Sequence, residues 1–361
     1  MHSTVRVSVV AMTVAAVVVP FGGQASAHES QHVPTIQVLS TTPLFPFQIA
    51  VSRGRVYVAD GGTSTVSILP STVLATGPTP GEVAGVDVGR KGQVAYTTTS
   101  YVTGDTTLTI QRQGKPPVVA DLSTFERTKN PDSKTEYGVR NPSQCVTDAL
   151  AGMGAPVSYT GEVDSHPYSV ASLGEDGWVV ADAGGNDLLR VDSKGRVSLL
   201  AVLPAQPLKI TSEIAATLKL PECVVGVTYR FEPVPTDVEV GPHGMLYVST
   251  LPGGPEDPSM GARGSVYVVN PHNGHARRVA TGFAGATNLA VTPDGTVYVA
   301  ELFGGQISVV MHGKAKPLVQ LPGALAVEWA KGDLYASTIA PTDAGGTPTG
   351  TGSVVKINLR D

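Results

Sequence analysis

The feature that most constrains the fold is a hairpin pattern that recurs six times along the chain. Each copy has a short apolar strand, a tight Gly-containing turn, and a Tyr/Val-rich strand that usually ends in a polar residue. The clearest copy spans 287–301, and the others span 46–60, 85–98, 167–182, 235–250 and 324–338. A repeat of roughly 40 residues with several strands per unit is typical of a β-propeller blade. We therefore predict an all-β fold, a six-bladed β-propeller.

The two ends of the chain are predicted to close the ring of blades together. The last repeat has only three strand-like segments, the third over 353–359, whereas residues 35–40 form a further strand-like segment near the start. We expect the N-terminal segment to be the outermost strand of the last blade, because this pairing removes an open sheet edge. The alternative is a loose N-terminal arm.

Long insertions interrupt the repeats on one face, where the second strand of each blade ends and which we call the top face. They span about 125–166, 204–233, 251–264 and 339–352. The two cysteines, Cys145 and Cys223, lie in the first two insertions. In an exported protein they are expected to form a disulfide, which would add ~2–4 kcal/mol and tie both insertions into a cap over the central channel. Two buried free thiols are the alternative. The alternative for the cap is that it only covers the junction between blades.

The first 27 residues have the pattern of a secretory signal peptide. Arg6 precedes an apolar stretch over 7–20, and Ala25-Ser26-Ala27 is a small-residue cleavage site. A buried N-terminal strand is the alternative. We predict a single domain over 28–361 that is secreted to the extracellular space without a membrane anchor. With a net charge of −5 and no cluster of lysines and arginines, the chain is not expected to bind nucleic acid.

Three stretches carry a resemblance to a known family. They are residues 180–192, 234–248 and 298–302. With these stretches the chain resembles the ScyD/ScyE-type exported proteins, six-bladed propellers related to the NHL and SMP-30-like groups, over nearly all residues after about 30. His243 stands where such turns usually carry aspartate. The resemblance implies the fold and export, and it implies no established reaction.

Polar side chains are predicted to gather at the top of the channel. Asp60, Asp182 and Glu301 end the second strands of blades 1, 3 and 5. The starts of the first strands carry four ligand-binding candidates: Gln48, Ser169, Asp237 and Asn288. Such oxygen ligands suit Ca²⁺ or Mg²⁺, the cofactors that this pattern suggests, with the three carboxylates as metal ligands. The alternative is that each aspartate before a glycine accepts hydrogen bonds within its own turn.

Histidine 166 is a further ligand-binding candidate on the top face. His166 has the titration range of a general base, although a lone loop histidine is more often solvated or engaged in a hydrogen bond. No G-x-S-x-G, phosphate-loop or H-E-x-x-H motif is present, so no catalytic residue is assigned.

The sequence favours a secreted binding or scaffold module whose partner is a small molecule, a glycan or an exported protein. The alternative is a metal-dependent hydrolase of the lactonase kind, and the sequence leaves open whether the protein is an enzyme. A quinone-dependent sugar dehydrogenase is disfavoured because the basic, His-rich pocket is missing.

Overall fold

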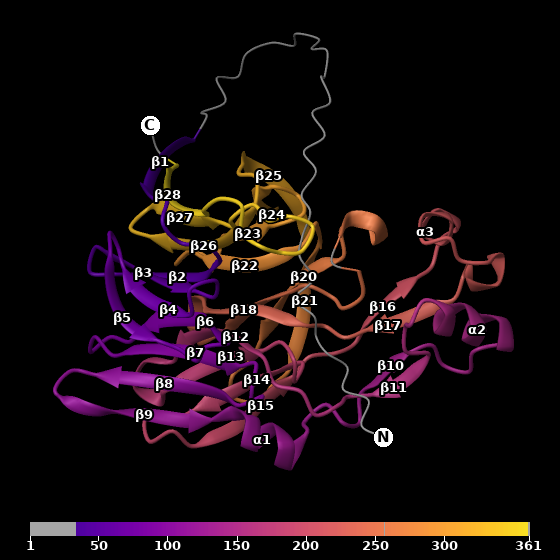
Figure 1. Ribbon diagram of the computed structural model, residues 1–361, viewed down its shortest axis with the longest axis horizontal. Coiled ribbons are helices and arrows are strands. Elements are labelled where there is room, and N and C mark those ends of the chain that lie inside the picture. Colours follow the sequence, from indigo (N-terminus) through magenta and orange to yellow (C-terminus); the bar gives the residue numbers. More distant parts are fainter. Residues whose placement is uncertain (1–33, 256, 360–361) are drawn as a thin grey trace, which may run out of the picture.

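The computed structural model describes residues 34–255 and 257–359, so the predicted signal peptide lies outside the described residues. Six blades of four strands form a ring (Figure 1), and the outermost strands of blades 4 and 5 pair at Thr281 and Lys314. The first strand of each blade contacts the first strand of the next, and β26 of blade 6 contacts β2 of blade 1. The prediction of a β-propeller is confirmed. None of the described helices combines the length and apolar character needed to cross a bilayer.

In blades 1 to 5, the strands run outward from the centre in chain order. Blade 1 consists of β2 (Pro46–Ser52), β3 (Arg55–Asp60), β4 (Thr65–Ile68) and β5 (Thr72–Thr76). Blade 2 consists of β6 (Gly81–Val88), β7 (Val94–Ser100), β8 (Thr106–Arg112) and β9 (Lys115–Asp121). Blade 3 consists of β12 (Pro167–Ser172), β13 (Trp178–Asp182), β14 (Asp187–Val191) and β15 (Val197–Val202).

The second half of the ring repeats this order. Blade 4 consists of β18 (Pro235–Val240), β19 (Leu246–Thr250), β20 (Gly264–Val269) and β21 (Ala276–Phe283). Blade 5 consists of β22 (Ala286–Val291), β23 (Val297–Glu301), β24 (Gln306–Met311) and β25 (Lys314–Gln320). Blade 6 consists of β26 (Ala324–Ala330), β27 (Asp333–Thr338), β28 (Ser353–Asn358) and the N-terminal β1 (Thr35–Ser40). Short 3₁₀ turns occur at η1 (Gly174–Asp176), η3 (Pro242–Gly244) and η4 (Pro258–Met260).

The ring closes as predicted from the sequence. Strand β1 pairs antiparallel with β28, from Thr35 opposite Asn358 to Ser40 opposite Val354. The N-terminal segment therefore supplies the outermost strand of blade 6, and the backbone groups of β28 have partners on both sides.

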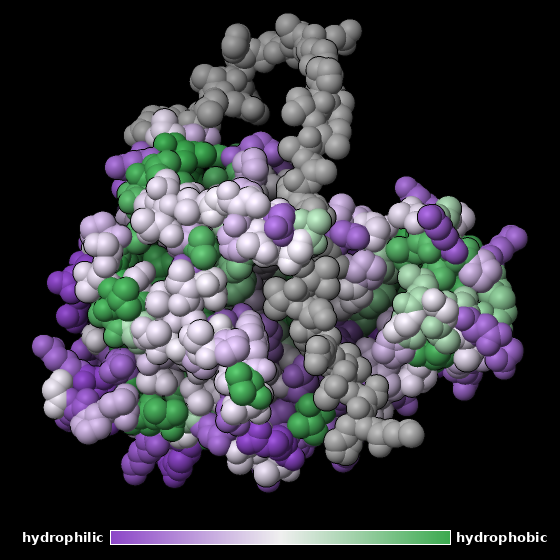
Figure 2. All heavy atoms as spheres, in the orientation of Figure 1, coloured by the Kyte–Doolittle hydropathy of each residue, from purple (hydrophilic) through white to green (hydrophobic). Residues whose placement is uncertain are grey.

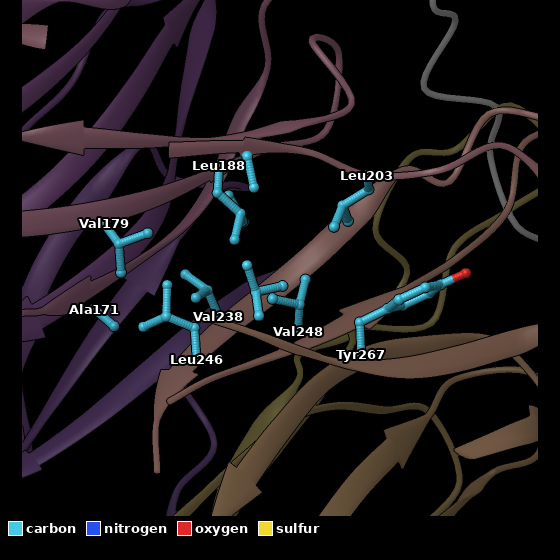
Figure 3. Packing of buried hydrophobic residues seen from close by; sticks show 11 residues of the cluster. Ala171, Val179, Leu188, Leu203, Val238, Leu246, Val248 and Tyr267 are labelled. Atoms are coloured by element: carbon cyan, nitrogen blue, oxygen red, sulfur yellow. The ribbon is translucent and has the colours of Figure 1, made fainter. Parts of the chain in front are cut away.

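Apolar side chains pack between neighbouring blades. Figure 3 shows the cluster between blades 3 and 4, where Ala171 and Val179 face Val238, Leu246 and Val248. Each of these five side chains is buried. Because side chains alternate along a strand, every blade presents an apolar set to each neighbour, and burial of these sets holds the ring together.

The two longest insertions fold into a small lobe with its own core. The lobe consists of a sheet in the order β11 (Ser158–Thr160), β10 (Glu136–Gly138), β17 (Thr228–Phe231) and β16 (Gln206–Lys209), together with α2 (Gln144–Gly152), α3 (Ser212–Thr217) and η2 (Glu222–Val224). A disulfide joins Cys145 in α2 to Cys223 in η2, which confirms the predicted pairing. The lobe extends outward from the blades in Figure 1. The predicted cap across the centre was therefore wrong, because the insertions bury their apolar residues against each other beside the ring.

A helix that the sequence did not predict connects blade 2 to the lobe. Helix α1 (Leu122–Lys129) begins at Asp121, whose side chain accepts a hydrogen bond from the amide of Thr124. It ends at Asn130, which has a left-handed conformation with φ of 35°. The helix packs against β8 and β15 and places Glu126 in the interior.

Candidate functional site

The four predicted ligand-binding residues on the first strands serve as links between blades. Gln48, Ser169, Asp237 and Asn288 are buried. An oxygen of each side chain accepts a hydrogen bond from a backbone amide on the next blade in chain order. The four donors are the amides of Val86 (2.8 Å), Val238 (3.0 Å), Leu289 (3.0 Å) and Val327 (2.8 Å). These side chains therefore stabilise the ring, and at least one oxygen of each is already engaged in a hydrogen bond.

The side chain of Gln48 also crosses the centre of the ring. Its amide nitrogen donates to Oδ1 of Asp237 and to the carbonyl oxygen of Val170, both at 3.2 Å. Blades 1 and 4 lie opposite each other in a ring of six. The contact between Gln48 and Asp237 therefore closes the channel at this level, and burial raises the pKa of Asp237 to about 7.

The three predicted metal ligands each accept hydrogen bonds from their own surroundings. Asp60 accepts from the amides of Leu44 (3.0 Å), Phe45 (2.8 Å) and Gly62 (3.1 Å) and from the hydroxyl of Thr63 (3.0 Å). Asp182 accepts from the amides of His166 (2.6 Å) and Gly185 (3.2 Å) and from the hydroxyl of Ser165 (2.7 Å). Glu301 accepts from the amides of Ala284 (2.6 Å) and the Gln306 side chain (2.9 Å) and from the hydroxyl of Ser308.

This geometry matches the turn-capping alternative for Asp60, Asp182 and Glu301. Within residues 34–255 and 257–359, no three histidine, cysteine, aspartate or glutamate side chains are grouped so that they could hold a metal ion. A metal site formed by these three carboxylates would require their loops to release them. It stays a prediction, which chelation experiments would test.

Histidine 166 is paired with a buried carboxylate. Its Nε2 contacts Oε1 of Glu82, and the hydroxyl of Tyr101 donates to Oε2 of Glu82 at 2.6 Å. Burial alone would lower the pKa of His166. The charge of Glu82 and the hydrogen bond to it outweigh burial, with help from Asp182, and raise that pKa to about 9. His166 is therefore a cation at neutral pH, which does not suit a general base.

A second set of carboxylates in the channel was missed by sequence reasoning. Asp87, Glu239 and Glu328 lie on the first strands of blades 2, 4 and 6, where they pair with Ala95, Tyr247 and Tyr335 of the second strands. Burial, and then the charges of Glu328, Asp237 and Asp87, raise the pKa of Glu239 well above its ordinary value. Burial, and then the charges of Asp87 and Asp237, do the same for the pKa of Glu328. The alanines at the same position in blades 1, 3 and 5 are Ala50, Ala171 and Ala290. When the six hairpins are aligned at this position, carboxylates and alanines alternate from blade to blade, and this alternation is the signal in the sequence that could have revealed the set.

A cluster of buried acids lies where blade 3 meets α1 and the lobe. Glu126, Asp132 and Asp187 are at most 2% exposed. Neither carboxylate oxygen of Asp187 has a hydrogen-bond partner among the described residues. Burial, and then the charges of Asp182 and Asp132, raise the pKa of Glu126 to about 8. Burial, reinforced by Asp182 and Glu126, raises the pKa of Asp187 well above its ordinary value. Much of this cluster is therefore protonated at neutral pH.

Asn186 links this acid cluster to the segment that leads from the lobe into blade 4. Its side-chain nitrogen donates to Asp132 at 3.0 Å, and its side-chain oxygen accepts from the amide of Val234 at 3.1 Å. Its φ of 56° lies in the left-handed region, which asparagine adopts more readily than most residues. The hydroxyl of Tyr137 also donates to the carboxylate of Asp132, at 2.9 Å.

The lobe contains a cavity of about 220 Å³. Apolar side chains line most of it, including Val146 and Leu150 of α2, Leu218 after α3, Phe231 of β17, and Met260 from the third insertion. Its polar lining comes from Tyr159, Tyr229 and Glu232. Figure 2 shows hydrophobic residues gathered on the surface of the lobe, at the right of the molecule. Three insertions thus build an apolar pocket apart from the channel, and the sequence signal for it was the apolar spacing in 141–153 and 211–220.

Comparisons with known proteins identify the fold. No protein-family model matches the chain, and no curated protein does. Among solved structures, a streptogramin B lyase is 11% identical with a TM-score of 0.50, over 91% of this chain and 98% of that one. A luciferin-regenerating enzyme is 10% identical with a TM-score of 0.46, over 90% and 95% of the two chains. A gluconolactonase from Xanthomonas campestris is 15% identical with a TM-score of 0.44, over 89% and 98%. At these identities the likeness shows the β-propeller fold alone.

Proposed function

We propose that the protein is an exported binding module of the ScyD/ScyE type and that its lobe holds a small, mostly apolar molecule. The observation that carries this proposal is the pocket of about 220 Å³ between the disulfide-linked insertions. Ligand sites are usually concave, apolar and equipped with a few polar groups at fixed positions, as this pocket is. Export is supported by the signal-peptide pattern in residues 1–27 and by the disulfide.

The volume of the pocket sets the size of the ligand. An apolar cavity of about 150 Å³ holds benzene, so a pocket of about 220 Å³ has room for roughly nine heavy atoms. At about 0.5 kcal/mol per heavy atom, such a ligand would bind with a Kd on the order of 0.1–1 mM. The propeller would then act as the rigid support that positions the lobe.

The alternative function, a metal-dependent hydrolase, has less support from the geometry. It requires free carboxylates at the top of the channel, whereas Asp60, Asp182 and Glu301 are occupied by donors from their own surroundings. It also gains nothing from His166, whose raised pKa keeps it protonated at neutral pH.

Calorimetry with phenethyl alcohol tests the binding function. We expect saturable binding to the wild-type protein and its loss in Ala155→Trp, because Ala155 lines the pocket and a larger side chain would fill it. Ala151→Trp is the matched control, since Ala151 is an exposed residue of α2 outside the lining. Equal binding to the wild type and to Ala155→Trp would contradict the proposal, and so would a wild type that binds neither phenethyl alcohol nor its amine or carboxylate analogue.

A further inference from the structure

The polar groups of the lobe pocket do not all remain free to meet a ligand. The hydroxyl of Tyr229 donates to the carbonyl oxygen of Pro156 at 2.7 Å. Glu232 is half-buried, follows β17 directly in the chain, and has a hydrogen bond with the side chain of Tyr159. A carboxylate has several acceptor positions, so one hydrogen bond leaves Glu232 able to accept more. Glu232 is therefore the principal acceptor that the pocket offers.

The surroundings of Glu232 are acidic. Besides Tyr159, the groups that act most strongly on its pKa are Asp132, Asp164 and Glu162, all carboxylates. Burial and then these charges raise the pKa of Glu232 to about 7, against the effect of the Tyr159 hydrogen bond. An anionic ligand would be repelled here, and a cation placed beside Glu232 would be attracted by several carboxylates at once.

Arg263 is a cationic side chain beside the pocket, and its contacts are with two residues of the lining other than Glu232. Its guanidinium lies 4.8 Å from the centre of the Phe231 ring and donates to the carbonyl oxygen of Gly253 at 2.9 Å. Asp257 is the acidic group that acts on its pKa. Arg263 is not among the groups that act most strongly on the pKa of Glu232, which are carboxylates and Tyr159, so the place of a counter-charge beside Glu232 is available to a ligand.

We propose that the lobe pocket selects amphiphilic amines, with an apolar body inside the pocket and a protonated amino group beside Glu232. This proposal rests on the proposed function and names its ligand class. The apolar lining takes the hydrocarbon part, with room for roughly nine heavy atoms in total. The rings of Tyr159 and Tyr229 add surfaces that attract a cation. A bound ammonium group would also favour the charged form of Glu232.

Three probes of nearly equal size separate this proposal from simple apolar binding. They are phenethylamine, phenethyl alcohol and phenylacetate, each titrated by calorimetry at pH 8 and at pH 5.5. At pH 8 we expect the amine to bind about tenfold more tightly than the alcohol, and phenylacetate to bind most weakly. The preference for the amine should shrink at pH 5.5, because Glu232 is then mostly protonated.

Glu232→Gln is the decisive variant. It should bring the ratio of amine to alcohol affinity close to one and remove the pH dependence of that ratio. Glu222→Gln is the matched control, because it makes the same change on an exposed lobe residue outside the pocket lining and should keep the wild-type ratio. Melting curves of both variants establish that they are folded.

Each outcome separates the two proposals. Binding of none of the three probes to the wild type would refute the binding function itself. Equal binding of the amine and the alcohol at pH 8 would leave the binding function standing and overturn the amine proposal. A preference for the amine that survives Glu232→Gln would also overturn it, since the cation would then be recognised elsewhere.

Discussion

Replacing Glu126 with glutamine tests whether the buried acids beside blade 3 are held in the folded protein as neutral groups. Glu126 is 2% exposed and lies among Asp132, Asp182 and Asp187. Glutamine has nearly the same shape as a protonated glutamic acid but cannot ionise. The variant should therefore match the wild type at low pH and be more stable than the wild type at high pH.

The magnitude follows from the raised pKa. The pKa of Glu126 rises from 4.5 to about 8, mainly through burial. A folded-state pKa above the unfolded value contributes stability that is complete below pH 4.5 and is lost as the pH rises through 8. At about 1.4 kcal/mol per pKa unit, the loss above pH 8 is roughly 3–6 kcal/mol, a large part of the ~5–15 kcal/mol that stabilises a typical protein.

Urea unfolding at pH 5 and pH 9 measures this difference. The fluorescence of Trp178 is a suitable signal, because Trp178 is buried in the core between blades 2 and 3. Phe125 of helix α1, which also carries Glu126, packs against the same core. Glu222→Gln, at an exposed lobe position, controls for the change in net charge. Equal pH dependence in Glu126→Gln and the wild type would refute the reasoning. A wild type that becomes more stable at pH 9 when Ca²⁺ is added would show instead that the carboxylates are ionised and bind a cation.

Three further outcomes are expected. Replacing Cys145 and Cys223 with serine should lower the free energy of unfolding by ~2–4 kcal/mol, as measured by urea unfolding, and should weaken probe binding in the lobe. Unchanged stability would mean that the lobe core suffices without the disulfide. Deleting residues 28–41 removes β1 and should cause aggregation, seen by light scattering, whereas a monomeric and equally stable product would contradict the closure role of β1. Asp182→Asn and Glu301→Gln should each lower the free energy of unfolding by about 1 kcal/mol, because each change weakens local hydrogen bonds. EDTA should leave the melting temperature of the wild type unchanged, and a clear fall in the melting temperature with EDTA would favour the metal site.

The ring and its closure were predictable because they depend on patterns that are local in sequence. The alternation of apolar residues in each hairpin indicates which face of a strand is buried, and the missing fourth strand of the last repeat points to residues 35–40. The disulfide was predictable because only two cysteines are present in a chain with an export signal pattern. The position of the two long insertions beside the ring was not predictable, because nothing in the sequence shows the direction in which an insertion leaves the ring.

The candidate site depended on contacts between distant segments. Asp60, Asp182 and Glu301 stand at the predicted ends of their strands, but their hydrogen-bond donors decide what the carboxylates can do. Gln48 was predicted near the axis, and only the fold shows that it reaches Asp237, 189 positions later in the chain.

The sequence by itself determined the blades, their order and the pairing of the two ends, because strand alternation and turn residues act over a few neighbouring positions. Only the tertiary structure decided which polar groups are left to act. It brings Glu126 close enough to Asp187 for their charges to interact and sets Glu232 in the lining of an apolar pocket. Burial and charge, which change pKa values and leave acceptors open, depend on the distances between side chains that are far apart in the sequence.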